Sequence, residues 1–353
     1  MSGQPLTELV NRSKELFDGT NLIITGDVAD PQLLALCRSC RLADVITDNY
    51  VTFSKMAAML GQQATDDMVQ SVSYKHITVY FAAVSAVIDK LRDYDCALVL
   101  LNKSKHASVE ILSLIQHRFS PSCRVYLAGA NSGGGKSADS LLKDAGTPFK
   151  VDSARKCTLF GVKVEHTFKN APAVKDVAVA GNSIRLLQSY SVFSCGKLDE
   201  GTALLLEILS TVKPETTALD LGCGCGVVGI SLKKAGFAKV TCVDVSAAAL
   251  DLTQKNASLN NTAVEIRPSD MLENTSRYDL IAVNPPFHQG ISTDRSPTLD
   301  MLSKAPLHLN DRGVMYLVGN AFLKYERVLS QIFRKVEIVK GTTRFSVIRA
   351  SMQ

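Results

Sequence analysis

Short apolar runs alternate with stretches of helical pattern along the whole chain, and this alternation limits the folds open to it. Parallel neighbouring strands need a crossover between them, usually a helix, so the pattern predicts βαβ units around mostly parallel sheets. Strands are expected at 21–25, 42–46, 75–80, 95–101, 123–129 and 157–164, and then at 216–221, 239–244, 264–268, 278–283, 313–318, 335–340 and 343–350. Helices are expected at 5–17, 31–39, 105–117, 137–145, 199–211, 226–236, 246–259, 296–308 and 323–333.

The chain has 353 residues, more than one ordinary hydrophobic core holds, because domains usually contain about 100–200 residues. We expect two α/β domains with Rossmann-like sheets, 1–168 and 169–353, joined without a Pro/Gly/Ser-rich linker. The segments DVAVA and SIRLLQ flank Gly181 and Asn182, residues typical of tight turns. They predict a hairpin that leads into the second sheet.

Composition and charge exclude several protein classes. Hydrophobic residues make up 46% of the chain and charged residues 21%, no apolar run reaches the roughly 18 residues of a membrane span, and the N-terminus has no apolar signal segment. Nine cysteines in such a chain indicate a reducing compartment. We therefore expect a cytoplasmic monomer with no membrane partner and no metal. The net charge of +5 permits a nucleic-acid partner without requiring one.

A glycine-rich loop in the second half follows one expected strand and precedes an expected helix. Residues 218–229 read ALDLGCGCGVVG, with Gly222, Gly224 and Gly226 after the end of the strand. Glycine lets the backbone turn sharply and lets a ligand lie against the main chain, and a helix N-terminus adds oriented N–H groups. The loop is therefore a candidate cofactor site.

Three carboxylates accompany this loop at strand ends. Asp220 precedes the glycines and can accept hydrogen bonds near a cationic amino-acid tail, whereas Asp244, at the end of the next strand, is placed to accept ribose hydroxyls. Asp270 follows a third strand, where it can meet an adenine amino group. This set fits S-adenosylmethionine. A nicotinamide cofactor uses similar features, and residues 224–229 also satisfy GxGxxG, so the loop alone leaves both cofactors open.

The motif Asn284-Pro285-Pro286-Phe287 follows the strand DLIAV, at the sheet edge where open α/β sheets hold their ligands. Two consecutive prolines remove two N–H donors, so the site offers mainly acceptors, the Asn284 side-chain oxygen and the Pro285 carbonyl. Those acceptors suit an –NH2 group on a planar ring, whose lone pair must be turned toward the methyl donor. Phe287 offers a flat surface to the base. The motif selects S-adenosylmethionine over a nicotinamide and predicts methylation of an exocyclic amine.

These motifs, together with SVFSCGKLDEGTALLLEIL, VNPPFHQG, VGNAFLKY and VDSARKC, resemble the bacterial 16S rRNA guanine-N(2) methyltransferases of the guanine-1207 type. The resemblance covers nearly the whole chain. It implies two tandem methyltransferase-like folds, of which the N-terminal one is degenerate and positions RNA, and the C-terminal one is catalytic. It also implies S-adenosylmethionine as methyl donor and 16S rRNA, in the 30S ribosomal subunit, as partner. The implied cofactor residues are Asp220, Gly222, Gly224, Asp244 and Asp270, and the implied catalytic motif is 284–287.

Several alternatives stay open at this point. The 23S rRNA guanine-N(2) enzymes share both halves and the NPPFHQ motif. DNA adenine and protein glutamine amide methyltransferases use NPP[FY], although the amide enzymes usually have Tyr where this chain has Phe287. A nicotinamide-dependent oxidoreductase would need an acid or base that we do not find. The loop ANSGGGKS (130–137) is one residue from a P-loop, but it follows about the fifth strand, whereas a P-loop normally follows the first.

Overall fold

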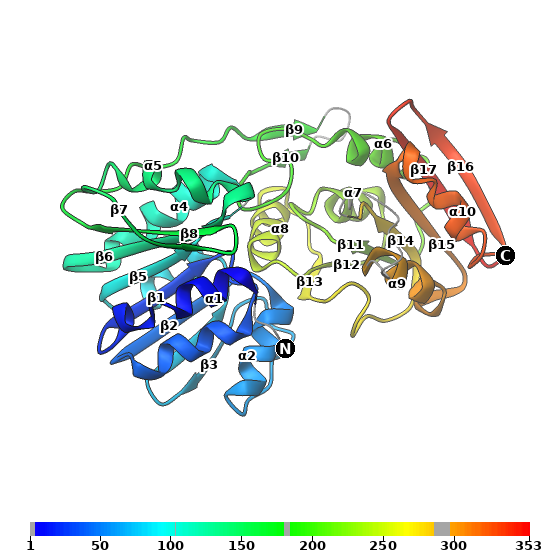
Figure 1. Cartoon of the computed structure of the whole chain (residues 1–353). Coiled ribbons are helices and arrows are strands. Elements are labelled where there is room, and N and C mark those ends of the chain that lie inside the picture. Colours follow the sequence, from blue (N-terminus) through cyan, green and yellow to red (C-terminus); the bar gives the residue numbers. More distant parts are fainter. Residues whose placement is uncertain (1–3, 103, 180–183, 286–296) are drawn as a thin grey trace. The chain divides into compact units, whose positions relative to one another are not determined.

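A computed structural model describes residues 4–102, 104–179, 184–285 and 297–353 (Figure 1). The chain forms two compact units, Met1–Ala173 and Val174–Gln353. Each unit contains one large sheet with its own hydrophobic core. Within the described residues, no helix combines the length and the apolar character that crossing a membrane requires.

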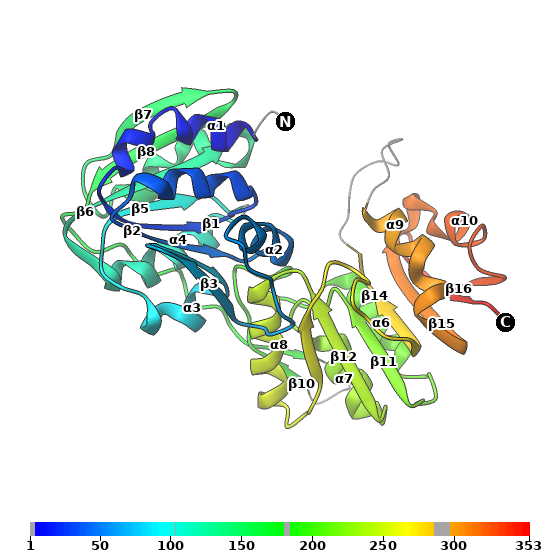
Figure 2. The same cartoon turned by 90° about the horizontal axis from the view of Figure 1, so that it is seen from below.

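The second unit is built on a seven-stranded sheet in the order β13-β12-β11-β14-β15-β17-β16 (Figure 2). The strands β13, β12, β11, β14 and β15 are parallel to one another, and β17 runs antiparallel to both of its neighbours. All strands expected in this half are confirmed, although β15 is longer than expected at both ends. They are β11 (Thr217–Leu221), β12 (Lys239–Asp244), β13 (Glu265–Pro268), β14 (Tyr278–Val283), β15 (Leu309–Asn320), β16 (Lys335–Gly341) and β17 (Phe345–Ser351).

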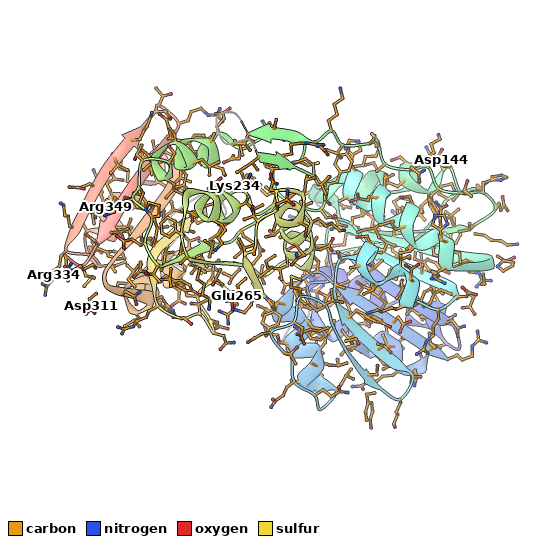
Figure 3. All side chains as sticks on the ribbon, turned by 180° about the vertical axis from the view of Figure 1, so that it is seen from behind. Asp144, Lys234, Glu265, Asp311, Arg334 and Arg349 are labelled. Atoms are coloured by element: carbon orange, nitrogen blue, oxygen red, sulfur yellow. The ribbon has the colours of Figure 1, made fainter. Side chains whose placement is uncertain are left out.

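Helices cover both faces of this sheet, and charged side chains such as Asp311 and Arg334 project from its periphery (Figure 3). Side chains alternate along a strand, so Leu219 and Ile281 share one buried face with Met301 of the helix α9. The helices are α6 (Glu200–Leu209), α7 (Val227–Ala235), α8 (Ala247–Leu259), α9 (Pro297–Lys304) and α10 (Tyr325–Leu329), with short 3-10 turns at Ala305–His308 and Ala321–Leu323. The expected helix 323–333 is thus shorter than predicted.

A short hairpin precedes this sheet. β9 (Val177–Val179) and β10 (Ile184–Leu186) pair antiparallel, which confirms the two expected strands, while Gly181 and Asn182 lie outside the described residues. The hairpin precedes the large sheet in the chain but does not join it, and forms a separate two-stranded sheet beside α8. Asn256 of α8 explains this placement, since its side chain satisfies the main chain that follows β10.

The first unit contains an eight-stranded sheet in the order β3-β4-β2-β1-β5-β6-β8-β7. The strand β3 pairs antiparallel with β4 at the edge of this sheet. If β3 is left out and the strands of each large sheet are numbered from its first strand, both sheets have the same spatial order. The unit is therefore a second copy of the same topology. Its strands are β1 (Asn21–Gly26), β2 (Leu42–Thr47), β3 (Gln70–Tyr74), β4 (Ile77–Phe81), β5 (Tyr94–Leu100), β6 (Phe119–Ala130), β7 (Phe149–Ala154) and β8 (Cys157–Lys163).

The helices of the first unit differ most from expectation. The segment expected as one helix at 5–17 is divided into α1 (Pro5–Asn11) and a 3-10 turn at Lys14–Phe17, and 31–39 is a 3-10 helix. The helix α2 (Tyr50–Met59), capped by Asn49, was not expected, because its β-branched and aromatic start obscures the helical pattern. The remaining helices are α3 (Val84–Val87), α4 (Lys105–Ile115) and α5 (Asp139–Leu142).

We predict that Asn256→Leu lowers the free energy of unfolding by about 3 kcal/mol. Asn256 is fully buried; its Nδ2 donates to the carbonyls of Leu187 (3.3 Å) and Cys225 (2.9 Å), and its Oδ1 accepts from the Leu187 N–H (2.7 Å). Leucine has a similar volume but leaves these main-chain groups unpaired. Urea unfolding is the measurement. Asn260→Ala, which removes less buried bonds to Arg185, is the control and should cost about 1 kcal/mol. Equal losses in the two variants would contradict this account.

Candidate active site

A cavity of about 540 Å³ opens at the carboxyl ends of β11, β12 and β14 in the second unit. This volume lies in the range of small-molecule and cofactor pockets. Its walls contain Asp220, Gly222, Gly224, Asp244 and Asp270, which are five of the six residues expected to bind the cofactor. Asn284 and Pro285 line the same cavity, so the two motifs meet in one place. Pro286 and Phe287 lie outside the described residues.

The glycine loop needs its glycines for two different reasons. Gly222, Gly224 and Gly226 have φ values of 73°, 55° and 80°, in the left-handed region that glycine adopts without strain. Gly222 and Gly224 face the cavity, where they let a ligand approach the main chain. Gly226, in contrast, does not line the cavity: a Cβ there would lie 2.7 Å from Cγ2 of Thr253. Its structural role is to let the start of α7 pack closely against α8.

Asp220 is almost completely buried on the sheet face that α7 covers. Its Oδ2 accepts a hydrogen bond from the Gly229 N–H at 2.8 Å. Burial raises the pKa of this carboxyl to about 7, against the lowering effect of the Gly229 hydrogen bond, and the nearby Asp244 adds to the rise. A buried carboxylate that carries this energetic cost is favourably placed to meet a cation.

Asp244 ends β12 with both carboxylate oxygens held by the backbone. Oδ2 accepts from the Gly224 N–H at 3.0 Å and Oδ1 from the Ser246 N–H at 2.9 Å. Burial raises the pKa of the Asp244 carboxyl, and these N–H groups oppose the rise. Asp270, two residues beyond the end of β13, lines the cavity and is half-buried.

The side-chain amide of Asn284 is held from one side only. Its Nδ2 donates to Oδ2 of Asp199 (3.1 Å) and to Oγ1 of Thr202 (2.8 Å). Its Oδ1 is buried and has no hydrogen-bond partner among the described residues. A buried carbonyl oxygen without a partner costs free energy, so it marks a place where a donor is missing. Asn284 lines the cavity, and its amide oxygen is an acceptor without a partner among the described residues.

Three residues of this site were not predicted from the sequence. Asp199 and Thr202 belong to the first turn of α6, and Phe193 lies in the loop before it with 64% of its surface exposed. All three line the cavity and fall within the segment SVFSCGKLDEGT. The one local signal was a capping pattern, because Asp199 accepts from the Thr202 N–H at 2.8 Å.

Comparison with known proteins identifies the family. Residues 7–177 match the N-terminal methyltransferase small domain, and residues 183–349 match the methyltransferase small domain. The ribosomal RNA small subunit methyltransferase C of Pseudoalteromonas atlantica is 36% identical over 274 residues, 74% of this chain and 78% of that protein. The protein of the same name from Vibrio vulnificus is 28% identical over 98% of both chains. The chain belongs to the ribosomal RNA small subunit methyltransferase C family.

A solved structure has the fold of the whole methyltransferase chain. It is the T. thermophilus 16S rRNA N2 G1207 methyltransferase in complex with AdoMet and guanosine, with a TM-score of 0.79, 21% identity, and coverage of 99% of this chain and 92% of that one. The expected α/β class with two tandem methyltransferase-like folds is thereby confirmed. Membership of this family also favours methyl transfer over the nicotinamide chemistry that the glycine loop alone left open.

Among its described residues, the first unit of this methyltransferase lacks the features of the cofactor site at the equivalent strand ends. Thr47 ends β2, where β12 ends in Asp244, and its hydroxyl donates to the Val28 carbonyl at 2.8 Å. A Cβ at Gly26, the end of β1, would lie 2.0 Å from the Leu100 carbonyl oxygen. The main chain thus fills the space that the glycine loop leaves open in the second unit.

The loop ANSGGGKS of the first unit is not built as a P-loop. Residues 131–137 form two short 3-10 turns, and α5 (Asp139–Leu142) is much shorter than the helix expected at 137–145. A Cβ at Gly135 would lie 2.2 Å from the Gly129 carbonyl oxygen, because the loop folds back on its strand. A P-loop needs a longer helix N-terminus to hold phosphate.

We predict that the cofactor-free protein loses stability as the pH rises from about 5 to 7. The pKa of Asp220 is about 7 in the folded chain and 3.8 as its ordinary value, so in this window the folded state binds a proton that the unfolded state has released. The expected slope is about 1.4 kcal/mol per pH unit, and it ends above pH 7. Urea unfolding of the wild type and of Asp220→Asn at several pH values measures the difference. Parallel pH curves for the two proteins would show that Asp220 does not titrate in this window.

Proposed function

We propose that this protein transfers a methyl group from S-adenosylmethionine to the exocyclic N2 amine of a guanine in 16S rRNA, of the guanine-1207 type. We propose the 30S ribosomal subunit as substrate, and hence the cytoplasm as the place of action. We also propose that the protein acts as a monomer. The observation that carries the proposal is the buried, unpartnered Oδ1 of Asn284 at the wall of a cavity that also contains the cofactor carboxylates. The names of the relatives support the RNA and the subunit.

The residues present fit S-adenosylmethionine, which supplies a methyl group on a sulfonium when bound. In our proposal Asp244 holds the ribose hydroxyls and Asp270 meets the adenine amino group. Asp220 faces the cationic end of the molecule, which compensates the cost of burying its carboxylate. The left-handed backbone at Gly222 and Gly224 leaves room for close contact with the main chain.

The remaining part of the cavity fits a planar amine. Oδ1 of Asn284 and the carbonyl of Pro285 are proposed to accept the two hydrogens of the guanine amine. Accepting both hydrogens turns the nitrogen toward tetrahedral geometry and aims its lone pair at the methyl group. Phe193 lines the same cavity with its ring exposed, so it offers a stacking surface in addition to the one proposed for Phe287. Catalysis then comes mainly from positioning.

No general base is needed in this scheme. The amine loses its proton only after it has become cationic, and water takes that proton. The chain's contribution is to hold the base unstacked, which in a structured RNA requires that the guanine be turned out of its helix or lie in a loop.

Transfer of a labelled methyl group tests this function directly. We expect label in 16S rRNA when 30S subunits are the substrate, and we expect nucleoside analysis to identify N2-methylguanosine. Label in 50S subunits or free 23S rRNA would support the large-subunit alternative instead. Label in DNA adenine or in protein would overturn the guanine assignment.

We predict opposite kinetic signatures for two variants of this site. Asn284→Ala should lower kcat at least about 100-fold and leave the Kd for S-adenosylmethionine nearly unchanged, because one transition-state hydrogen-bonding group typically contributes that much. Asp244→Ala should instead weaken cofactor binding. Calorimetric titration with the cofactor and single-turnover methylation of 30S subunits separate the two effects. The assignment of roles would be wrong if Asn284→Ala lost cofactor binding in parallel with activity.

A further inference from the structure

The side-chain amide of Asn284 can present either its oxygen or its nitrogen to the cavity. The two orientations differ by a half-turn about the last side-chain bond and have nearly the same shape. Only one of them suits a substrate amine, because an –NH2 group facing another –NH2 group leaves both without an acceptor. The neighbours of the amide therefore decide whether the proposed acceptor exists at all.

Asp199 and Thr202 contact the amide nitrogen from the side away from its free oxygen. Asp199 Oδ2 lies 3.1 Å from Nδ2, and Thr202 Oγ1 lies 2.8 Å from the same atom. Asp199 Oδ2 accepts hydrogen bonds from the Thr202 N–H and hydroxyl, so the amide group that it faces is placed to be the N–H. In the reversed orientation, the amide oxygen would lie against a carboxylate oxygen, which is repulsive.

The Thr202 hydroxyl makes the same selection. Its hydrogen is directed to Asp199 Oδ2 at 3.1 Å, so its lone pairs are left for the Asn284 nitrogen. The three side chains form a closed arrangement of three contacts, in which the amide nitrogen of Asn284 faces two acceptor atoms, Asp199 Oδ2 and Thr202 Oγ1. The amide oxygen, Oδ1, is left unpaired and buried.

The start of α6 keeps this arrangement rigid. Asp199 is the N-cap of the helix and also accepts from the Thr202 N–H at 2.8 Å. Gly201 between them has no side chain, and a Cβ there would lie 3.1 Å from Asp199 Oδ2 and 3.2 Å from the ring of Phe345. The glycine thus lets the carboxylate and the Phe345 ring close around the first turn.

We propose that Asp199 and Thr202 are positioning residues that hold the Asn284 amide with its oxygen toward the substrate amine. The inference rests on the proposed function, because it assigns the free oxygen to an amine substrate. Neither residue has to touch the substrate: their part is to exclude the reversed amide, which would leave the cavity and the cofactor residues unchanged but remove the acceptor.

The test compares Thr202→Val with Thr202→Ser. Valine has nearly the shape of threonine but no hydroxyl, whereas serine restores it. Thr211→Val is the control, because it removes a hydroxyl just beyond the C-terminal end of α6, which donates to the Ile208 carbonyl (2.8 Å). For each protein, kcat on 30S subunits, the Kd for S-adenosylmethionine and the melting temperature are measured. Inhibition by guanosine is compared with inhibition by inosine, which lacks the N2 amine.

We expect Thr202→Val to lower kcat about tenfold, since one hydrogen bond of about 1.4 kcal/mol is lost, and to reduce the preference for guanosine over inosine. The Kd for S-adenosylmethionine should stay within about twofold. Serine should restore kcat to within about threefold of the wild type, and Thr211→Val should leave all values unchanged. A Thr202→Val enzyme with wild-type kcat, or a serine variant as impaired as the valine variant, would overturn the inference. So would a parallel loss of cofactor binding.

Asp199→Asn provides a second route if Thr202→Val does not fold. Asparagine is also a good N-cap, so the start of α6 is kept. Its amide can, however, turn an N–H toward Asn284, so the substituted residue no longer selects one orientation of the Asn284 amide. We expect a lower kcat at an unchanged melting temperature, and an unimpaired variant would again overturn the inference. If the wild type itself methylates no rRNA, the proposed function fails. If the wild type is active and the variants are equally active, the proposed function stands and only the positioning role of Asp199 and Thr202 fails.

Discussion

The proposed activity depends on a carbonyl oxygen that is buried and unpaired among the described residues. Oδ1 of Asn284 gives up its bonds to water and gains none among the described residues, at a cost of about 1–3 kcal/mol in the free protein. Asp199 and Thr202 maintain this state by accepting hydrogen bonds from the amide nitrogen. The carboxyl of Asp220 is also buried at a cost in free energy, because burial raises its pKa to about 7. In our proposal, the cationic methyl donor and the substrate amine offset these two costs.

The two units show that the same fold can occur with such a site and without it. Their sheets have the same strand succession, apart from the added edge strand β3. The second unit leaves space at the strand ends beside two left-handed glycines, Gly222 and Gly224, and lines it with Asp244. The first unit has Thr47 at the matching position, and a hydrogen bond from its hydroxyl to the Val28 carbonyl closes the gap. A scaffold without this space is free to serve another purpose, and we propose RNA positioning.

Local patterns in the sequence were sufficient for every strand of the two large sheets except β3 and β7, for the glycine loop and for the position of the carboxylates at strand ends. Strand periodicity and turn chemistry are properties of neighbouring residues. They were insufficient for Asp199 and Thr202, which lie 85 and 82 residues from Asn284 in the sequence and contact it only in the folded sheet. Gly226 was assigned to the cofactor site from the motif, yet it serves the contact with Thr253, because helix packing is a tertiary property. The place of the β9–β10 hairpin depended on Asn256 for the same reason.

A crystal structure with S-adenosylhomocysteine and guanosine is the most direct test of the central claim. It should show the guanine N2 within about 3.2 Å of Asn284 Oδ1, with the amide nitrogen still bonded to Asp199 and Thr202. The sulfur of the cofactor product should lie on the line that the transferred methyl group would follow to that amine. A guanine bound with its amine away from Oδ1, or an Asn284 amide turned with its nitrogen toward the base, would contradict the account.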